Sequence, residues 1–337
     1  MSDAAVASAT GTVLDVRGLA VEFHGHGVPV RPVRAVSFAL EAGRRLGLVG
    51  ESGSGKSLTA LALMRLLPRQ ARIAAGSVHL GGDDLTQLPE KEMARLRGAR
   101  IAMVYQDPMS SLNPLQSIGD QIVEAIRAHE PVKRREAHKR AVDLLGHVGL
   151  PNPERRFESY PHQFSGGMRQ RVMIAMAVCA NPDVLIADEP TTALDVTTQA
   201  RIMDLLDTLV EERGTSVMLI THDLGLAGSF CDDIQVMYAG RIVERGGGAT
   251  VFDRPVHPYT DALVHSICRL DHDVRQPIAA IPGQPPLPQR LPDGCPFHPR
   301  CAFAAASCRE SEPELIALPD GHSAACWFAE SRAGVGR

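Results

Sequence analysis

The fold of this chain is decided by the stretch Gly50-Glu51-Ser52-Gly53-Ser54-Gly55-Lys56-Ser57. An apolar run typical of a buried strand, 46–49, precedes it, and an apolar stretch with helical spacing, 58–67, follows it. A strand, a loop of the form G-x-x-x-x-G-K-[ST] and a helix, in this order, predict a loop that binds phosphate groups. The glycines let backbone N–H groups turn inward around phosphate oxygens, and the helix N-terminus favours an anion. We expect Lys56 to reach the β- and γ-phosphates and the Ser57 hydroxyl to ligate Mg²⁺.

The segments around this loop form an α/β pattern with one domain boundary. Alternation of apolar and polar residues near the N-terminus predicts antiparallel strands, whereas two short, wholly apolar runs predict parallel strands covered on both faces. After Gly246 proline becomes frequent and periodicity fades, so we place a boundary near Gly248. The patterns predict strands at 13–23, 33–40, 78–80, 101–105, 184–187 and 217–220, and helices at 58–67, 118–149, 167–180 and 197–213.

Composition limits the function classes. The 337 residues are 44% hydrophobic and 22% charged, as in an ordinary globular protein with a large core and an appendage. The formal net charge of -4 gives no basic field, so we expect no nucleic-acid partner. The longest apolar run, 172–180, is shorter than the roughly 20 residues that cross a bilayer. The first ten residues do not resemble a signal peptide, so we expect a cytosolic chain.

Two acidic residues, Asp188 and Glu189, follow the apolar run 184–187. A carboxylate at the tip of a strand can order Mg²⁺, a role that we assign to Asp188. Glu189, one residue further on, can polarise the attacking water as a general base. Acidic residues at a strand end are also common in solvated turns. The pair therefore gains its meaning from the phosphate loop in the same chain.

A second glycine-containing helix start is Phe164-Ser165-Gly166-Gly167-Met168-Arg169-Gln170-Arg171. Ser165 can cap the helix, while the N–H groups of Gly166 and Gly167 remain available for an anion. Taken alone, the segment is better explained as an ordinary capped helix.

Together, these segments resemble the motifs of the ATP-binding cassette (ABC) family. The set comprises, in family order, a Walker A motif at 50–57 followed by Leu58, a Q-loop glutamine at Gln106, a signature at 165–170, a Walker B motif ending at Asp188-Glu189, a D-loop at 193–195 and a switch histidine at His222. The resemblance covers 13–246. The signature departs from the family pattern at Phe164, where Leu is usual, and at Met168, where Gln is common. Neither position belongs to Ser165-Gly166-Gly167.

The resemblance implies a fold and roles for single residues. The fold is an α/β P-loop NTPase (RecA-like) core with an antiparallel β subdomain and a helical signature subdomain at about 108–178. Domain 1–248 is the ATPase, and 249–337 is a small cysteine-containing C-terminal region. His222 contacts the γ-phosphate, Gln106 approaches Mg²⁺ and the attacking water, and Phe23 stacks on adenine. Two cassettes pair head to tail, so that Ser165, Gly166, Gly167 and Gln170 of one cover the phosphates that the other holds.

A narrower resemblance extends over nearly the whole chain. The ATPase subunits of bacterial oligopeptide and dipeptide importers are similar to this chain in four segments, 105–114, 168–172, 237–244 and 257–260, and also in the tail at 282–283 and 295–301. The resemblance implies uptake of peptides, or alternatively of nickel or another small substrate. It also implies a paralogous second ATPase, two transmembrane permeases and an extracytoplasmic binding protein, with this chain on the cytoplasmic side of the membrane.

Four of the seven cysteines, Cys295, Cys301, Cys308 and Cys326, lie in the tail. Clustered cysteines in a cytosolic chain favour metal or redox chemistry over disulfides. The tail contains no short C-x₂₋₄-C knuckle of the kind that structural zinc sites use. Four thiolates at wider spacing can hold a [4Fe–4S] cluster, which is our first interpretation. Zinc, with help from His298 or His322, and buried free thiols are the alternatives.

Three classes of function follow. The first is an importer motor. The second is a soluble cassette protein that acts on ribosomes or DNA, which usually carries two cassettes per chain. The third is a small-molecule kinase, which would leave the signature at 165–170 and His222 unexplained.

Overall fold

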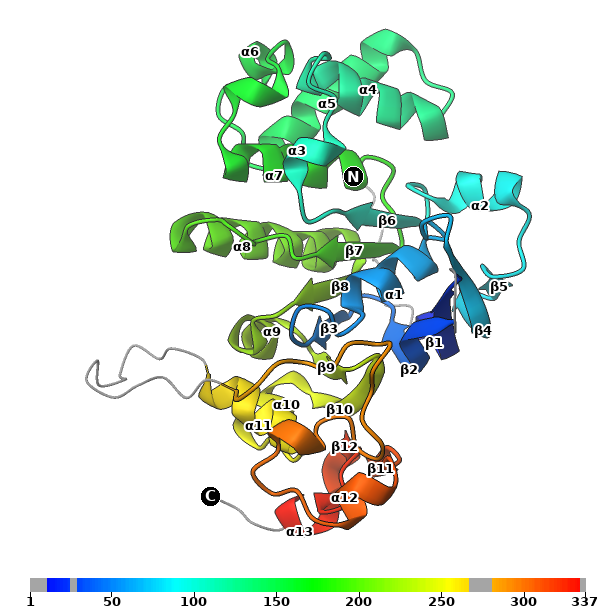
Figure 1. The fold of residues 1–337 in the computed structure, drawn as a ribbon. Coiled ribbons are helices and arrows are strands. Elements are labelled where there is room, and N and C mark those ends of the chain that lie inside the picture. The colour runs from blue at the N-terminus through cyan, green and yellow to red at the C-terminus, as the bar shows by residue number, and fades with distance from the viewer. Residues whose placement is uncertain (1–10, 25–28, 267–280, 334–337) are drawn as a thin grey trace. The chain divides into compact units, whose positions relative to one another are not determined.

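The computed structural model describes residues 11–24, 29–266 and 281–333, and the chain divides into two compact units (Figure 1). The first unit contains the residues up to Val13, Leu40–Arg44 and Gln87–Met218. The second contains Leu14–Ala39, Arg45–Thr86 and the residues from Leu219 onward. In the described ranges, no helix combines the length and the apolar character needed to cross a bilayer.

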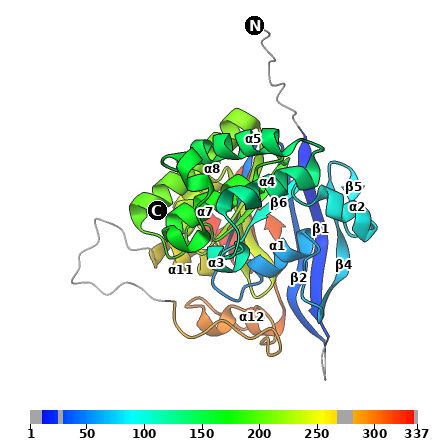
Figure 2. The ribbon, with the colours of Figure 1, turned by 90° about the horizontal axis from the view of Figure 1, so that it is seen from above.

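The N-terminal strands form a four-stranded sheet. Its order is β2 (Val30–Glu41), β1 (Thr12–Phe23), β4 (Ala71–Leu80) and β5 (Asp83–Asp84). Strand β1 runs antiparallel to β4, from Leu14 opposite Leu80 to Phe23 opposite Ala71, and β4 runs antiparallel to β5. Figure 2 shows the long strands β1, β2 and β4 side by side. The predicted strands at 13–23 and 33–40 are confirmed, and the strand predicted at 78–80 begins earlier, at Ala71.

The second unit also holds most of a larger sheet. The order there is β11 (Ile316–Ala317), β12 (Ser323–Ala324), β10 (Arg241–Gly247), β9 (Asp233–Tyr238), β3 (Arg45–Val49) and β8 (Ser216–Thr221). Strand β3 runs parallel to β9, and β9 turns back into β10 as an antiparallel hairpin. The α-helices of this unit are α1 (Lys56–Leu63), α9 (Leu224–Phe230), α10 (Gly248–Asp253), α11 (Pro258–His265), α12 (Ser307–Glu310) and α13 (Ala329–Ala333), with short 3₁₀ turns η2 (His298–Arg300) and η3 (Pro319–Gly321).

The first unit contains the other end of this sheet and a helical region. Its strand order is β8, β7 (Val184–Asp188) and β6 (Ile101–Val104), and β6 runs parallel to β7. Helices α4, α5 and α7 pack on one another and are seen together in Figure 2. The helices are α2 (Glu90–Leu96), α3 (Pro108–Ser111), α4 (Ile118–His129), α5 (Arg134–His147), α6 (Pro153–Phe157), α7 (Gly166–Ala177) and α8 (Val196–Arg213), with the 3₁₀ turn η1 (Pro161–Gln163).

Several predicted boundaries were wrong by a few residues, for identifiable reasons. The helix predicted at 58–67 begins at Lys56 and ends at Leu63, because Arg65 has a positive φ of 51°. The helix predicted at 118–149 is two helices, since Pro131 lies in the break between α4 and α5. The boundary proposed near Gly248 stays a prediction. Strand β10 ends at Gly247 there, and α10 begins at the next residue.

Candidate nucleotide-binding site

The phosphate loop lies in the second unit, between β3 and α1, in the predicted order. Strand β3 is buried from Leu46 to Val49 and leads directly into Gly50. Helix α1 starts at Lys56, with Gly55 as its N-cap in a left-handed conformation (φ 108°). The loop N–H groups therefore precede a helix N-terminus, whose partial positive charge favours an anion.

Glycine is required at two loop positions by the close approach of neighbouring backbone. A Cβ atom on Gly50 would lie 2.2 Å from the carbonyl oxygen of Met237, and one on Gly55 would lie 2.6 Å from that of Pro32. At Gly53, by contrast, nothing lies within 4 Å of an added Cβ. The loop is thus packed against its own unit at both ends and open around its middle.

The polar groups of this loop have the chemistry of a phosphate site. The Lys56 side chain is buried and curls over the loop, where Nζ donates to the carbonyl oxygens of Gly50 (2.7 Å) and Glu51 (3.0 Å). The buried Ser54 hydroxyl has no hydrogen-bond partner among the described residues. Buried polar groups are normally paired, so an unpaired donor inside a glycine-rich loop fits a ligand with oxygen acceptors. Ser57, the predicted Mg²⁺ ligand, is the second residue of α1 and is half-buried.

In the first unit, neighbouring strands bring Gln106 and Glu189 together. Strands β6 and β7 are parallel, with Val104 opposite Ala187, so both residues follow strand ends at the same edge of the sheet. The Gln106 Nε2 atom donates a hydrogen bond of 2.9 Å to Oε2 of Glu189. Asp188, the last residue of β7, is buried. Carboxyl ends of parallel strands are where α/β proteins usually bind ligands.

Glu189 itself has an unusual backbone. Its φ of 47° lies in the left-handed region, which is uncommon for a residue other than glycine and is concentrated at functional sites. The Thr192 hydroxyl donates to the same Oε2 atom at 2.8 Å. Two donors on one oxygen, with a fixed backbone, hold the carboxylate in one orientation.

The signature segment begins helix α7 as predicted. The Ser165 hydroxyl caps the helix by accepting a hydrogen bond from the Met168 N–H at 3.4 Å, and Ser165 and Gly166 are exposed. A Cβ atom on Gly167 would lie 2.2 Å from Cγ2 of Thr198, so glycine lets α7 approach the start of α8. Gln170 differs from these residues because its side chain is buried, and its Nε2 has no hydrogen-bond partner among the described residues.

Two further predicted residues lie in the second unit. His222 is exposed directly after β8, and the next residue, Asp223, caps α9 by accepting from the Leu226 N–H at 3.0 Å. Phe23 ends β1 and is half-buried. The residues 25–28, which follow it closely, lie outside the described ranges. The phosphate loop, His222 and Phe23 thus belong to one unit, and Gln106, Asp188, Glu189 and the signature belong to the other.

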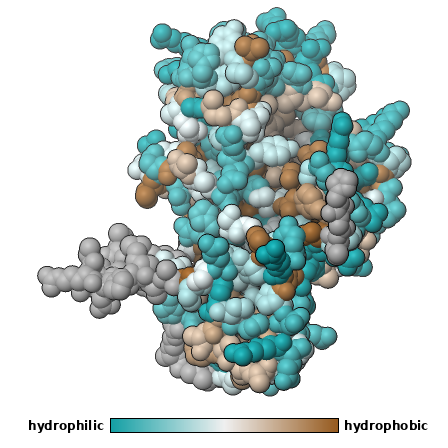
Figure 3. Space-filling model, viewed as in Figure 1, coloured by the Kyte–Doolittle hydropathy of each residue, from teal (hydrophilic) through white to brown (hydrophobic). Residues whose placement is uncertain are grey.

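The four tail cysteines line one small cavity in the second unit. Burial raises the pKa of the Cys295 thiol to about 11, and the nearby thiols add to this shift. Backbone N–H groups of Phe303 and Phe328 donate to the sulfur atoms of Cys301 and Cys326, each at 3.4 Å. Figure 3 shows hydrophobic residues gathered on the surface around these C-terminal elements. Within the described ranges, no group of three or more His, Cys, Asp or Glu side chains is arranged to hold a metal ion.

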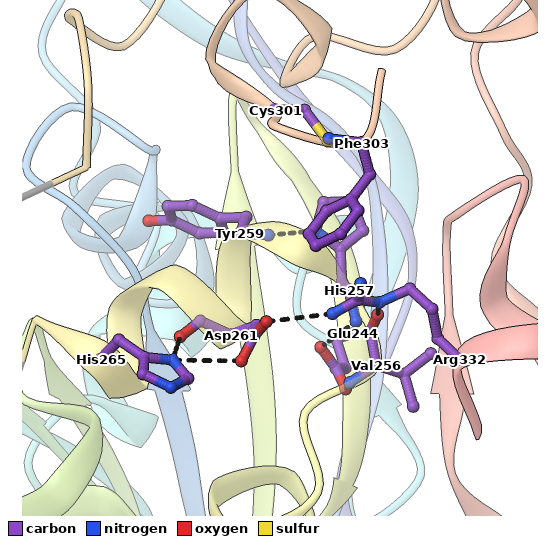
Figure 4. A network of polar contacts seen from close by, with 9 residues as sticks. All are labelled: Glu244, Val256, His257, Tyr259, Asp261, His265, Cys301, Phe303 and Arg332. Carbon is purple, nitrogen blue, oxygen red and sulfur yellow. Dashed lines mark hydrogen bonds and ion pairs between the residues drawn. The ribbon is translucent and has the colours of Figure 1, made fainter. Parts of the chain in front are cut away.

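A buried polar network attaches this tail to α11 and β10 (Figure 4). The Glu244 carboxylate on β10 is fully buried and accepts from the N–H groups of Val256 (2.7 Å) and His257 (2.9 Å). Burial, and to a smaller extent the charge of Arg332, lowers the pKa of His257 to about 3. The neutral His257 ring accepts from the Tyr259 N–H at 3.0 Å and so caps α11.

One contact of the phosphate loop was missed by sequence reasoning. The Glu51 carboxylate accepts two hydrogen bonds from Arg300, from Nη1 at 2.6 Å and from Nη2 at 3.0 Å. The two residues are 249 positions apart, and each belongs to a different sequence motif. Opposite charges in two distant segments do not by themselves indicate that the segments are in contact.

Comparison with protein families gives two matches. The family described as ABC transporter matches residues 33–192, and the one described as oligopeptide/dipeptide transporter, C-terminal region, matches residues 243–308. The first match contains the phosphate loop, Gln106, the signature and Glu189. The second contains Arg300 and three of the four tail cysteines.

Relatives match over almost the full chain. A probable peptide ABC transporter ATP-binding protein of Sinorhizobium fredii is 48% identical over 94% of this chain and 94% of its own length. The oligopeptide transport ATP-binding protein OppD of Salmonella typhimurium is 48% identical, over 94% of this chain and 93% of its own. Among solved structures, a dimeric ATP-binding cassette bound to ADP and phosphate is 28% identical, with a TM-score of 0.63, and covers 69% of this chain and 98% of its own.

Proposed function

This chain belongs to the ABC transporter family, among relatives that are ATP-binding proteins of peptide transporters, and on that premise we propose that it hydrolyses ATP to drive peptide uptake. The observation that carries the proposal is the presence, in one chain, of the 50–57 loop and a C-terminal region of the oligopeptide and dipeptide transporter type. Nickel or another small substrate is the alternative cargo. A soluble, non-transport ATPase is the alternative class, and the C-terminal match does not favour it.

For the chemistry, we assign the triphosphate to the loop and the reacting groups to the strand ends. Lys56 would bind the β- and γ-phosphates, and Ser57 and Asp188 would hold Mg²⁺ together with Gln106. Glu189 would accept a proton from the attacking water, and His222 would contact the γ-phosphate. The fixed orientation of the Glu189 carboxylate supports its role, because a general base must lie within hydrogen-bond reach of the proton that it abstracts. The adenine would stack on Phe23.

The signature implies a second cassette. Ser165 and Gly166 are exposed at the start of α7, where their position suits an anion held by another subunit. We propose a paralogous ATPase as that subunit, two permeases as the membrane part and an extracytoplasmic protein that delivers the substrate. The chain would then act on the cytoplasmic face of the membrane, held there by the permeases.

We propose that the tail holds a [4Fe–4S] cluster, with a zinc ion as the alternative. What supports the proposal is that the four thiols line one cavity together with apolar and aromatic side chains. Cys295, Cys301, Cys308 and Cys326 would hold the cluster as thiolates, and the N–H groups of Phe303 and Phe328 would stabilise the charge on sulfur. We assign the cluster a structural role.

Iron and zinc analysis of the anaerobically purified chain tests the cluster. We expect about four iron atoms per chain, brown protein with broad absorption in the visible range, and loss of both in Cys308→Ser. Stoichiometric zinc without iron would favour the alternative, and neither metal would leave the cysteines as buried free thiols.

Co-purification tests the transport function. Expressed with its neighbouring genes, the tagged chain should be recovered with two multi-span membrane proteins and a second ATPase. Recovery with ribosomes or DNA instead would contradict the proposal. Lys56→Ala should weaken binding of Mg·ATP to the purified chain, and unchanged affinity would remove the 50–57 loop as the nucleotide site.

A further inference from the structure

Glu51, the second residue of the phosphate loop, carries a negative charge where a triphosphate is expected to bind. Its carbonyl oxygen accepts from Lys56 Nζ at 3.0 Å, and its N–H donates to the Tyr259 hydroxyl at 2.7 Å. Its carboxylate is held by both terminal nitrogens of Arg300, at 2.6 and 3.0 Å. Like charges repel, so a carboxylate at this place opposes a bound polyphosphate unless a cation neutralises it.

Contacts other than the one with Glu51 hold the Arg300 side chain in place. Its side chain is only 5% exposed, and its Nε donates to the carbonyl oxygen of Pro282 at 2.8 Å. Its guanidinium lies 5.9 Å from the ring centres of both Tyr238 and Phe297. The hydrogen bonds to Glu51 raise the pKa of Arg300 above its usual value. This effect outweighs that of burial, which acts in the opposite direction. A planar guanidinium held in this way presents two donors in the geometry that a carboxylate accepts.

We propose that Arg300 is a positioning residue for nucleotide binding, which neutralises the Glu51 carboxylate and holds it aside so that the loop can accept a triphosphate. The inference rests on the proposed binding of ATP to the 50–57 loop and adds to that site a residue outside the six motifs of the ATP-binding cassette. Without Arg300, the carboxylate would be released beside the loop as an uncompensated charge, and such a charge is costly when its partner is removed from a partly buried pair.

The position of Arg300 links the loop to the tail. Arg300 is the last residue of η2 and directly precedes Cys301, and the Cys295 N–H donates to the Cys308 carbonyl oxygen at 2.8 Å. The segment that carries the thiols therefore also supplies the counter-charge of the phosphate loop. This contact gives the C-terminal region a defined task in the ATPase.

A double-mutant cycle on the full chain tests the proposal. The affinity for a fluorescent ATP analogue with Mg²⁺ is measured for wild type, Arg300→Ala, Glu51→Gln and the double variant. We expect Arg300→Ala to weaken binding about tenfold, which corresponds to about 1.4 kcal/mol, a usual coupling for contacting charges. Adding Glu51→Gln should restore most of the affinity, because the unpaired charge is then gone. A double variant as weak as Arg300→Ala, or an Arg300→Ala variant with wild-type affinity, would overturn the proposal.

A matched arginine in the same tail controls for loss of packing. Arg332 also pairs with a carboxylate, Asp261, at 3.0 Å, and is 20% exposed, but its hydrogen-bond partners, Asp261 and the Val256 carbonyl oxygen, lie outside the 50–57 loop (Figure 4). Arg332→Ala should leave nucleotide affinity unchanged, and a tenfold loss there would show that any damage to the tail weakens binding. If Arg300→Ala does not fold, Arg300→Lys replaces it, since lysine keeps the charge but loses the paired donors. Its smaller loss must again be recovered by Glu51→Gln.

The proposed function and this inference fail in different ways. If the wild-type chain does not bind the ATP analogue, or binds it equally well as Lys56→Ala, the proposed nucleotide site is wrong. If Lys56→Ala weakens binding but Glu51→Gln does not rescue Arg300→Ala, only the role of Arg300 is wrong.

Discussion

Gly167→Ala is a sharp test of why the signature needs its second glycine. The added Cβ atom would lie 2.2 Å from Thr198 Cγ2, about 1.3 Å inside the shortest favourable carbon–carbon contact. The Thr198 side chain cannot turn away freely, because its hydroxyl donates to Asp195 Oδ2 at 2.7 Å and its N–H donates to Oδ1 at 3.0 Å. Relief therefore requires either the loss of the hydroxyl bond or the separation of α7 from α8.

The expected cost follows from these contacts. Overpacking of this kind costs about 1–3 kcal/mol, and loss of a hydrogen bond adds about 1 kcal/mol. Replacing glycine by alanine gains at most about 0.8–1.0 kcal/mol of helix propensity, since that value applies to a helix interior and Gly167 is the second residue of α7, so the gain offsets only part of the cost. We expect a net destabilisation of about 1–3 kcal/mol, visible as a lower midpoint of thermal unfolding. Hydrogen exchange should locate the change at α7 and at the start of α8.

Two further variants make the test specific. Gly166→Ala is the matched control, since its Cβ atom would lie 3.5 Å from Leu194 Cδ2, an ordinary contact, and we expect no destabilisation. Thr198→Ser removes Cγ2 but keeps the hydroxyl for Asp195, so Gly167→Ala should cost little in that background. The reasoning is refuted if Gly167→Ala is as stable as Gly166→Ala, or if Thr198→Ser does not reduce its cost.

Three other predictions concern catalysis, pH and the tail. Glu189→Gln should keep Mg·ATP affinity and reduce turnover by at least about 100-fold, as expected for loss of a general base; wild-type turnover in a steady-state ATPase assay would exclude this role. Burial lowers the pKa of His257 to about 3. Below about pH 6.5 the unfolded chain therefore binds a proton at this residue that the folded chain does not bind. The stability of the fold should thus decrease as the pH drops from 6.5 towards 3. His257→Asn, whose side-chain oxygen can still accept from the Tyr259 N–H, should flatten this acid dependence in unfolding measurements, and an unchanged slope would assign it to other groups. Cys301→Ser should lower the iron content and, since Arg300 is the preceding residue, also weaken ATP binding. Loss of iron with unchanged ATP affinity would show that the tail metal does not influence the 50–57 loop.

The parts of the site that could be predicted from sequence are those set by neighbouring residues. The 50–57 loop is recognisable because its glycines, lysine and serine are consecutive and lie between a strand and a helix. Ser165 was predicted as an N-cap for the same local reason, and the structure places its hydroxyl on the Met168 N–H. These features need no knowledge of how distant segments pack.

The remaining features depend on tertiary contacts. The sequence predicts both strands before Gln106 and Glu189. Only the structure shows that these strands pair in parallel and that the two side chains form a hydrogen bond of 2.9 Å. The exposed Ser165 and the buried Gln170 lie within six residues of one another in the signature, and sequence alone did not separate their surroundings. The Glu51–Arg300 pair joins two segments 249 residues apart, and no local pattern connects them.

Uptake of a labelled peptide into proteoliposomes tests the central claim most directly. The vesicles would contain this chain with the proposed second ATPase, permeases and binding protein, and Mg·ATP would be supplied on the side of this chain. We predict ATP-dependent accumulation of peptide, coupled to hydrolysis, that is lost when this chain carries Glu189→Gln. Accumulation that persists with Glu189→Gln, or ATP hydrolysis that does not respond to peptide, would contradict the account.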